Sequence, residues 1–326
     1  EGVLAGERDV GGSQPCGGAL TGTVEHVVDE TYSRLRALPG YSRRLKEPVA
    51  ETLRYIDSLV EGVPGAILCS RSAFREDPSV NAFFVDPKHM REVFSGNAEV
   101  REFLDSNPDT KECWAVLYMR RDERRHLGMS LVGDAVQRDV MQTAVSFTDH
   151  QVVAPGGSED EAKCALKCRI FNGLLSFIRN KADASKTLAM DLENRLKSVR
   201  GRLSHAAEGE GHQELRAELQ AKIDNLELKL AQQDLRLASL EDYLDFVAYV
   251  LGNPTEYLSN RTCAIRLSRM GIKLEDGSLE AGYEVPLSEV RIGSQESRVG
   301  ALVRFPRSEL LPQQDFLTRA DLFLAL

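Results

Sequence analysis

A heptad pattern in the second half of the chain constrains the fold more than any other sequence feature. Ten positions between residues 213 and 251 alternate at spacings of four and three, and nine of the ten are apolar. This spacing is typical of a coiled-coil seam, so the sequence predicts one long helix over 213–251. Gln233 is the polar seam residue, of the kind that fixes register at a cost in stability. The predicted seam comprises Leu219, Ile223, Leu226, Leu230, Gln233, Leu237, Leu240, Leu244, Val247 and Leu251.

A second long helix is predicted directly before this one. Ser158 and Glu161 have the spacing of a capping box, and no proline follows until well beyond residue 206. A shorter seam runs through this arm, at Leu192, Leu196, Val199, Leu203 and Ala206. Gly209 and Gly211 then break the helix, which favours an antiparallel helical hairpin or coiled coil over 158–252. In one interpretation the chain folds back on itself; in the other, the seam also packs against other subunits.

Residues 23–157 are predicted to form an N-terminal α+β domain. Apolar residues recur on one helical face over 47–62, and Asp86 followed by Pro87 is a helix start signal. From 113 to 155 the pattern becomes β-branched and aromatic, which predicts three or four antiparallel strands. Turns are expected at the charged stretch Arg121–Arg125 and near Gly133.

Residues 253–326 are predicted to form a small C-terminal antiparallel β-domain, barrel-like, with strands in 262–275, 281–293 and 298–305. The fold class is therefore α+β. Because the two ends of a helical hairpin lie close together, we expect the strands before and after it to join into one sheet, with the coil as an insertion. Residues 1–22 are Gly-rich, with neither an initiator Met nor the apolar stretch of a signal peptide, and are interpreted as a flexible tail or fragment boundary.

Composition excludes several classes of protein. The chain has 326 residues and a net charge of −9, which argues against a general nucleic-acid binder. Its six cysteines have no framework spacing, so we expect reduced thiols and a cytoplasmic location. No apolar run approaches the roughly 20 residues that a membrane span needs.

The stretch Leu267-Ser268-x-x-Gly271-Ile272 interrupts a strand pattern with a serine and a glycine. Together with the heptad helix ahead of it, this stretch resembles the PilZ family, small β-barrels of which many bind the bacterial second messenger cyclic di-GMP. The resemblance covers roughly residues 213–305 and points to a tetrameric, coiled-coil-bearing subgroup whose members often lack the nucleotide site and act through assembly. The N-terminal domain is not part of the resemblance.

The resemblance also assigns candidate ligand-binding residues. Ser268 and Gly271 match the family's Asp/Asn-x-Ser-x-x-Gly element, while Arg266 stands where that element has Asp or Asn. Arg261 and Arg266 are five positions apart, not four as in the family's Arg-x-x-x-Arg element. The resemblance therefore implies a domain that has lost cyclic di-GMP binding. The alternative is a sensor that binds cyclic di-GMP through Arg266, Ser268 and Gly271, with Arg261 contributing.

The remaining motifs are better explained by structural roles than by ligand or metal binding. The pairs Arg120/Arg124 and Arg121/Arg125 suit phosphates, but Asp122 and Glu123 lie between them, which predicts a solvated hairpin tip. Cys164 and Cys168 share a helix face without further ligands, so neither a metal site nor a cofactor is predicted.

The predicted function is non-catalytic. We expect a regulatory or scaffolding protein whose helical hairpin mediates self-association or binds a protein partner. A second alternative is an enzyme in the N-terminal domain, for which Cys113, His126 and His150 would be the candidates.

Overall fold

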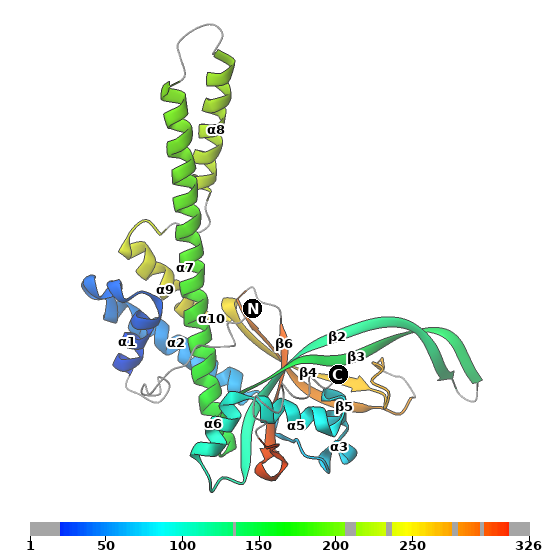
Figure 1. Cartoon of the computed structure of the whole chain (residues 1–326). Coiled ribbons are helices and arrows are strands. Elements are labelled where there is room, and N and C mark those ends of the chain that lie inside the picture. The colour runs from blue at the N-terminus through cyan, green and yellow to red at the C-terminus, as the bar shows by residue number, and fades with distance from the viewer. Residues whose placement is uncertain are drawn as a thin grey trace, which may run out of the picture. The chain divides into compact units, whose positions relative to one another are not determined.

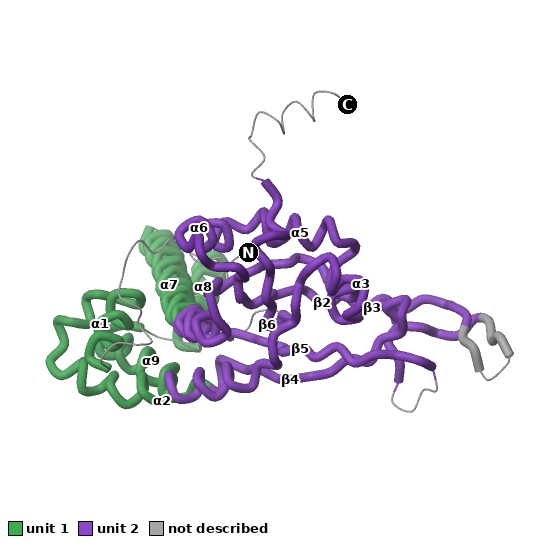
Figure 2. The backbone as a smooth tube through the Cα atoms, turned by 90° about the horizontal axis from the view of Figure 1, so that it is seen from below, with its two compact units in different colours: residues 1–52, 172–254 green, residues 53–171, 255–326 purple. Residues whose placement is uncertain are grey.

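The computed structural model describes residues 20–132, 135–205, 213–232, 237–275, 280–293 and 297–312. Helices and strands are mixed along the chain, as Figure 1 shows, so the α+β class is confirmed. The residues group into two compact units, each built from separate stretches of sequence (Figure 2). Unit 1 comprises residues 1–52 and 172–254, and unit 2 comprises 53–171 and 255–326.

Unit 1 is helical. Its elements are α1 (Leu20–Thr31), η1 (Ser33–Ala37), the first part of α2 (Tyr41–Glu61), most of α7 (Glu159–His205), α8 (Gln213–Ala231) and α9 (Leu240–Gly252). Tyr243 of α9 donates a hydrogen bond from its hydroxyl to the Thr31 carbonyl oxygen at 3.1 Å, and Thr52 donates to the Leu251 carbonyl at 2.5 Å. These bonds tie α9 to α1 and α2 around a buried apolar core.

Unit 2 is built around one sheet covered by short helices. The strands are β1 (Ile67–Leu68), β2 (Glu112–Val132), β3 (Ala135–Gly156), β4 (Leu258–Leu267), β5 (Tyr283–Ile292) and β6 (Arg298–Pro306). The helices are α3 (Ala73–Glu76), α4 (Pro78–Phe83), α5 (Pro87–Gly96), α6 (Ala98–Ser106), α10 (Pro254–Tyr257) and η3 (Arg307–Glu309), with the end of α2 and the start of α7. The strand order is β3-β2-β6-β5-β4, and β1 pairs in parallel with β6.

The sheet joins strands from both sides of the helical insertion, as the sequence predicted. β2 pairs antiparallel with β6 from Glu112 opposite Pro306 to Met119 opposite Val299. The segments 23–157 and 253–326, predicted as separate domains, therefore share one sheet. The physical reason is that an unpaired edge of β2 and an unpaired edge of β6 satisfy each other's backbone hydrogen-bonding groups.

Both faces of the central strands are buried. In β2, Cys113, Ala115 and Leu117 pack into the large core cluster that includes Phe94 and Phe305, while Val116 and Tyr118 point to the opposite face. The rings of Phe94 and Phe305 stack with centroids 4.5 Å apart, so α5 is fixed against β6. Asp86 caps α5 as predicted, accepting from the His89 amide at 2.7 Å.

The prediction of one helix over 213–251 is wrong. Helix α8 ends at Ala231, and α9 begins at Leu240 behind a capping box formed by Ser239 and Asp242. The seam residues Leu240, Leu244, Val247 and Leu251 belong to α9; of these, Leu244, Val247 and Leu251 are fully buried in the core of unit 1. Apolar residues at alternating spacings of four and three occur in coiled coils and also in any amphipathic helix that packs on a globular core. The spacing alone therefore could not distinguish one long coiled-coil helix from two shorter helices. Leu237 lies between the two helices, and Gln233 lies outside the described residues.

The prediction of three or four strands over 113–155, with a turn at Arg121–Arg125, is also wrong. β2 runs through this stretch without a break, and β2 and β3 form one long ribbon (Figure 1). Charges are tolerated there because they pair: Asp122 accepts from Thr148 at 2.7 Å and lies 3.3 Å from the Arg120 guanidinium. The turn predicted near Gly133 lies outside the described residues.

Candidate functional site

The turn from Ser268 to Gly271 is the site that the sequence singled out. The Gly271 amide donates to the Ser268 carbonyl at 3.0 Å, and the Ser268 amide donates to the Ile272 carbonyl at 2.8 Å. Gly271 has φ +71°, a conformation that a residue with a Cβ adopts only at a cost, which explains the glycine. The interruption of the strand is therefore a tight turn at the end of β4.

Of the candidate ligand-binding side chains, Ser268 forms hydrogen bonds within this turn and Arg266 forms one with Glu280. Ser268 is 4% exposed, and its hydroxyl accepts from the amides of Met270 and Ile272, both at 3.3 Å. Arg266 donates from Nη2 to the Glu280 carbonyl oxygen at 2.9 Å. Arg261 is exposed on β4. The structure thus assigns Ser268 a local role in shaping the backbone.

The turn also links the two ends of the sheet. The Val145 amide of β3 donates to the Gly271 carbonyl at 2.8 Å, and the Lys273 amide donates to the Thr143 carbonyl at 2.8 Å. Leu274 in turn donates to the Arg266 carbonyl of β4 at 2.9 Å. The segment after β4 therefore bridges from β4 to β3, so the sheet curls back on itself.

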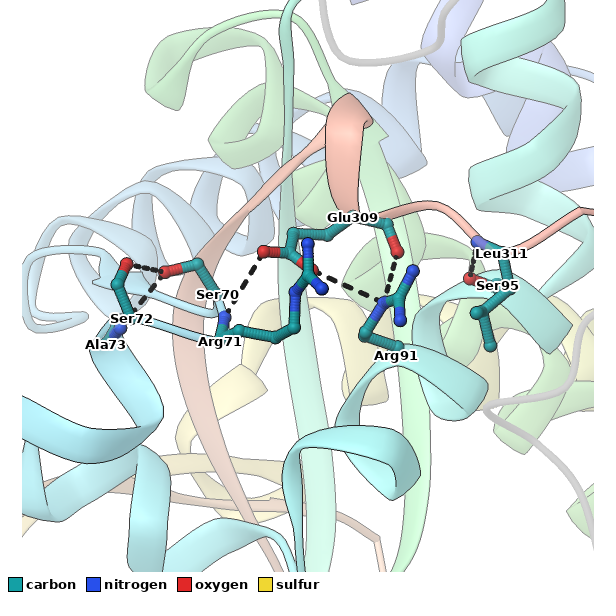
Figure 3. Close-up of polar contacts among 8 residues, drawn as sticks. All are labelled: Ser70, Arg71, Ser72, Ala73, Arg91, Ser95, Glu309 and Leu311. Atoms are coloured by element: carbon teal, nitrogen blue, oxygen red, sulfur yellow. Dashed lines mark hydrogen bonds and ion pairs between the residues drawn. The ribbon is translucent and has the colours of Figure 1, made fainter.

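A second polar cluster was not found from the sequence. Glu309, 8% exposed, accepts from Arg71 Nε at 2.9 Å and lies 3.3 Å from Arg91 Nε, as Figure 3 shows. Arg91 also donates to the Glu309 carbonyl oxygen, and Ser95 accepts from the Leu311 amide at 2.8 Å. Because Arg71 holds the carboxylate of Glu309 and Arg91 holds its carbonyl oxygen, the cluster acts as a clasp that fixes the segment after β6 to the residues before α3 and to α5. Glu309 follows Arg307 and Ser308 in a segment without a recognisable motif, so the sequence gives no signal for this cluster.

The candidates for an enzyme occupy separate places on the ribbon. Cys113 and His126 are 13 residues apart on β2, about 40 Å at the rise of a strand. Burial raises the pKa of Cys113 to about 12, which opposes formation of a thiolate. His150 is held by the Phe83 carbonyl at 2.6 Å, while its neighbour Asp149 pairs with Arg298 at 2.6 Å. The structure does not bring the three candidates together.

The paired helices α7 and α8 carry the other candidate surface (Figure 1). Leu192 and Leu196 of α7 and Leu219 and Ile223 of α8 are buried, at the predicted seam positions of both arms. Arg200 and Glu227 form an ion pair across the two helices at 2.6 Å. Leu226 and Leu230 are half-buried. The seam is therefore short, and we define residues 185–205 and 213–231 as the helical arm.

A groove runs along one side of this arm, with a volume of about 540 Å³. Val199, Ala221 and Leu226 supply its apolar surface, and Arg195, Lys222 and Glu218 supply charges of both signs. Beyond the groove, four large apolar side chains of the arm are more than two-fifths exposed: Leu188, Met190, Leu215 and Leu228. The exposed surface of the arm thus includes apolar as well as charged side chains.

Comparison with known proteins finds no match: no family model, no curated protein and no solved structure is similar to this chain. Within the part of the chain that the structure describes, no helix combines the length and hydropathy that a bilayer crossing requires. The described residues also contain no group of three or more His, Cys, Asp or Glu side chains positioned to hold a metal ion.

Proposed function

We propose that this protein is a non-catalytic regulatory or scaffolding protein that assembles with a second copy of itself through the helical arm. The observation that carries the proposal is the groove along α7 and α8. It combines an apolar floor with flanking charges of both signs, and its volume accommodates several side chains.

Charge complementarity favours a second copy as the occupant. Arg195 and Lys222 flank the groove together with Glu218. Within one chain Lys222 pairs with Glu218 and Arg195 pairs with Asp191, so charges of both signs lie on the same surface and can exchange partners. When two copies of such a surface face each other about a two-fold axis, each carboxylate can meet a cation of the other copy. The apolar residues at the centre would then be removed from water, which supplies the favourable free energy.

The test is the molar mass of the full chain by light scattering over a range of concentrations. We expect twice the mass of the single chain for the wild type. Ala221→Glu places a charge in the groove and should shift the protein to the single-chain mass. Ala184→Glu makes the same substitution at an exposed position of α7 that does not line the groove, and it should leave the mass unchanged. A single-chain mass for the wild type, or equal behaviour of the two variants, would contradict the proposal.

For the β-strands after the arm, we propose a PilZ-like β-domain that has lost cyclic di-GMP binding. Support comes from the hydrogen bonds of Ser268, whose hydroxyl is used by its own turn, and of Arg266, which reaches the Glu280 carbonyl. The curl of the sheet through residues 271–274 is compatible with a small barrel. Calorimetric titration with cyclic di-GMP should give no saturable heat. Saturable heat that Arg266→Ala weakens would instead favour the sensor hypothesis.

A further inference from the structure

Unit 2 contains a narrow, mainly apolar cavity that is distinct from the proposed assembly surface. It lies between the sheet face of Val116 and Tyr118 and the helix segments that end α2 and begin α7. Nine aliphatic side chains dominate the lining: Leu59, Val60, Val63, Val116, Leu166, Ile170, Leu258, Val290 and Ile292. Asn260, Ser288, Tyr118, Gly300, Ser259 and Arg291 complete it.

Two polar atoms in this lining are buried without a hydrogen-bond partner, Asn260 Oδ1 and Ser288 Oγ. Asn260 is held in one orientation because its Nδ2 donates to the Leu59 carbonyl at 2.9 Å, which leaves Oδ1 as a free acceptor. Ser288 is 2% exposed. A buried polar atom without a partner costs free energy, so two of them in one cavity call for an explanation.

The register of the sheet places the two side chains on the same face. Asn260 is opposite Val290, and Ser288 is two residues from Val290 on β5, so Asn260 and Ser288 are diagonal neighbours. Such neighbours have Cα atoms roughly 7–8 Å apart, which allows one small group to contact both side chains. Gly300 lies opposite Ser288, and a Cβ there would come within 2.9 Å of the Tyr118 ring, so the glycine keeps the ring against the sheet.

We propose that this cavity binds the hydroxyl end of a slender aliphatic molecule. Asn260 Oδ1 can only accept, so the ligand must donate; Ser288 Oγ can donate to the same ligand oxygen. The free volume is about 20 Å³, which admits one oxygen-sized group beside the two polar atoms. The aliphatic part of the ligand would lie among the surrounding side chains toward half-buried Val63 and exposed Arg291, and these side chains must rotate to accommodate it.

The probe is 1-hexanol, titrated calorimetrically into the full chain. Dipropyl ether is the matched control ligand, because it has the same number of heavy atoms but no hydrogen to donate. We expect saturable binding of 1-hexanol. The affinity for dipropyl ether should be about tenfold lower, because one hydrogen bond is lost. Ser288→Ala should lower the affinity for 1-hexanol by a similar factor.

Stability of the ligand-free protein provides the second measurement. Ser288→Ala removes an unpartnered buried hydroxyl, so its thermal midpoint without ligand should equal or exceed that of the wild type. Ser58→Ala, on an exposed part of α2, should change neither binding nor the midpoint. The absence of saturable binding, or equal affinities for wild type and Ser288→Ala, would mean that the cavity holds a water molecule at most, and would overturn the proposal.

Discussion

Three residues of β3 adopt a left-handed backbone conformation although none is glycine: Asp139, Asp149 and Ala154, with φ of 59°, 53° and 56°. Each lies where the register between β2 and β3 shifts, so that two residues of β3 are opposite one of β2. These are β-bulges, which bend a strand and increase its twist. The curvature of the long ribbon is thus introduced at particular residues of β3.

Ala154 gives the first prediction, because alanine lacks the polar side chain with which aspartate eases this conformation. Ala154→Gly removes the steric cost of the Cβ, so the free energy of unfolding should rise by about 0.5–1 kcal/mol. Ala144→Gly, in the same strand at a position without a positive φ, should lower it by about the same amount. Urea unfolding of the two variants measures both changes, and a loss of stability in Ala154→Gly would contradict the role assigned to the bulge.

At the scale of the elements, short segments are held by side chains from distant parts of the chain. η3 and the residues after it are fixed by Glu309, by Arg91 and by Arg307, which donates to the Leu104 carbonyl at 2.7 Å. A helix of three residues has no stability of its own, so these contacts determine its place.

Replacement of Glu309 by glutamine tests this clasp. Glu309→Gln keeps the shape but removes the charge that faces Arg71 and Arg91, so the free energy of unfolding should fall by about 1–3 kcal/mol. Glu112→Gln, whose carboxylate is partly exposed and 3.5 Å from Arg304, should cost less than about 1 kcal/mol. Equal costs for the two variants in urea unfolding would show that the Glu309 cluster is not a clasp.

At the scale of the whole molecule, His150 links stability to pH. Burial, followed by the nearby charge of His89, lowers the pKa of His150, although the Phe83 carbonyl and Asp149 oppose the shift. The folded state therefore favours the neutral imidazole, and the unfolded chain binds a proton at higher pH. The stability contributed by His150 is complete above its ordinary pKa near 6.5 and is lost as the pH falls through the lower pKa of the folded state.

The measurement is the thermal midpoint between about pH 7.5 and pH 5. The thermal midpoint of His150→Gln should fall less steeply than that of the wild type as the pH is lowered over this interval, because glutamine cannot take up a proton. His126→Gln, at an exposed position of the ribbon, should retain the wild-type dependence of the thermal midpoint on pH. A wild-type slope in His150→Gln would show that the buried histidine does not contribute to acid sensitivity.

Local signals in the sequence predicted much of the secondary structure. Asp86 caps α5, the helix from residue 159 to 205 follows Ser158, and β5 and β6 match the predicted strands to within two residues. β4 overlaps its predicted strand only over 262–267, because the turn at Ser268 ends it. The joining of the two strand groups into one sheet was predicted as well. These features depend on capping residues, on periodicity and on chain connectivity, which act over short distances or follow from topology.

Only the tertiary structure decided which surfaces the periodic segments cover. The apolar positions of α9 continue the heptad of α8, yet they pack on α1 and α2, because periodicity specifies an apolar face and not its partner. Ser268 looked like a ligand residue and caps its own turn, whereas Glu309, Asn260 and Ser288 stand in no motif. The sequence by itself determined the α+β class, the starts of α5 and α7 and the strands β5 and β6, because these depend on local signals. The clasp and the cavity arise from side chains that come together only when distant segments fold.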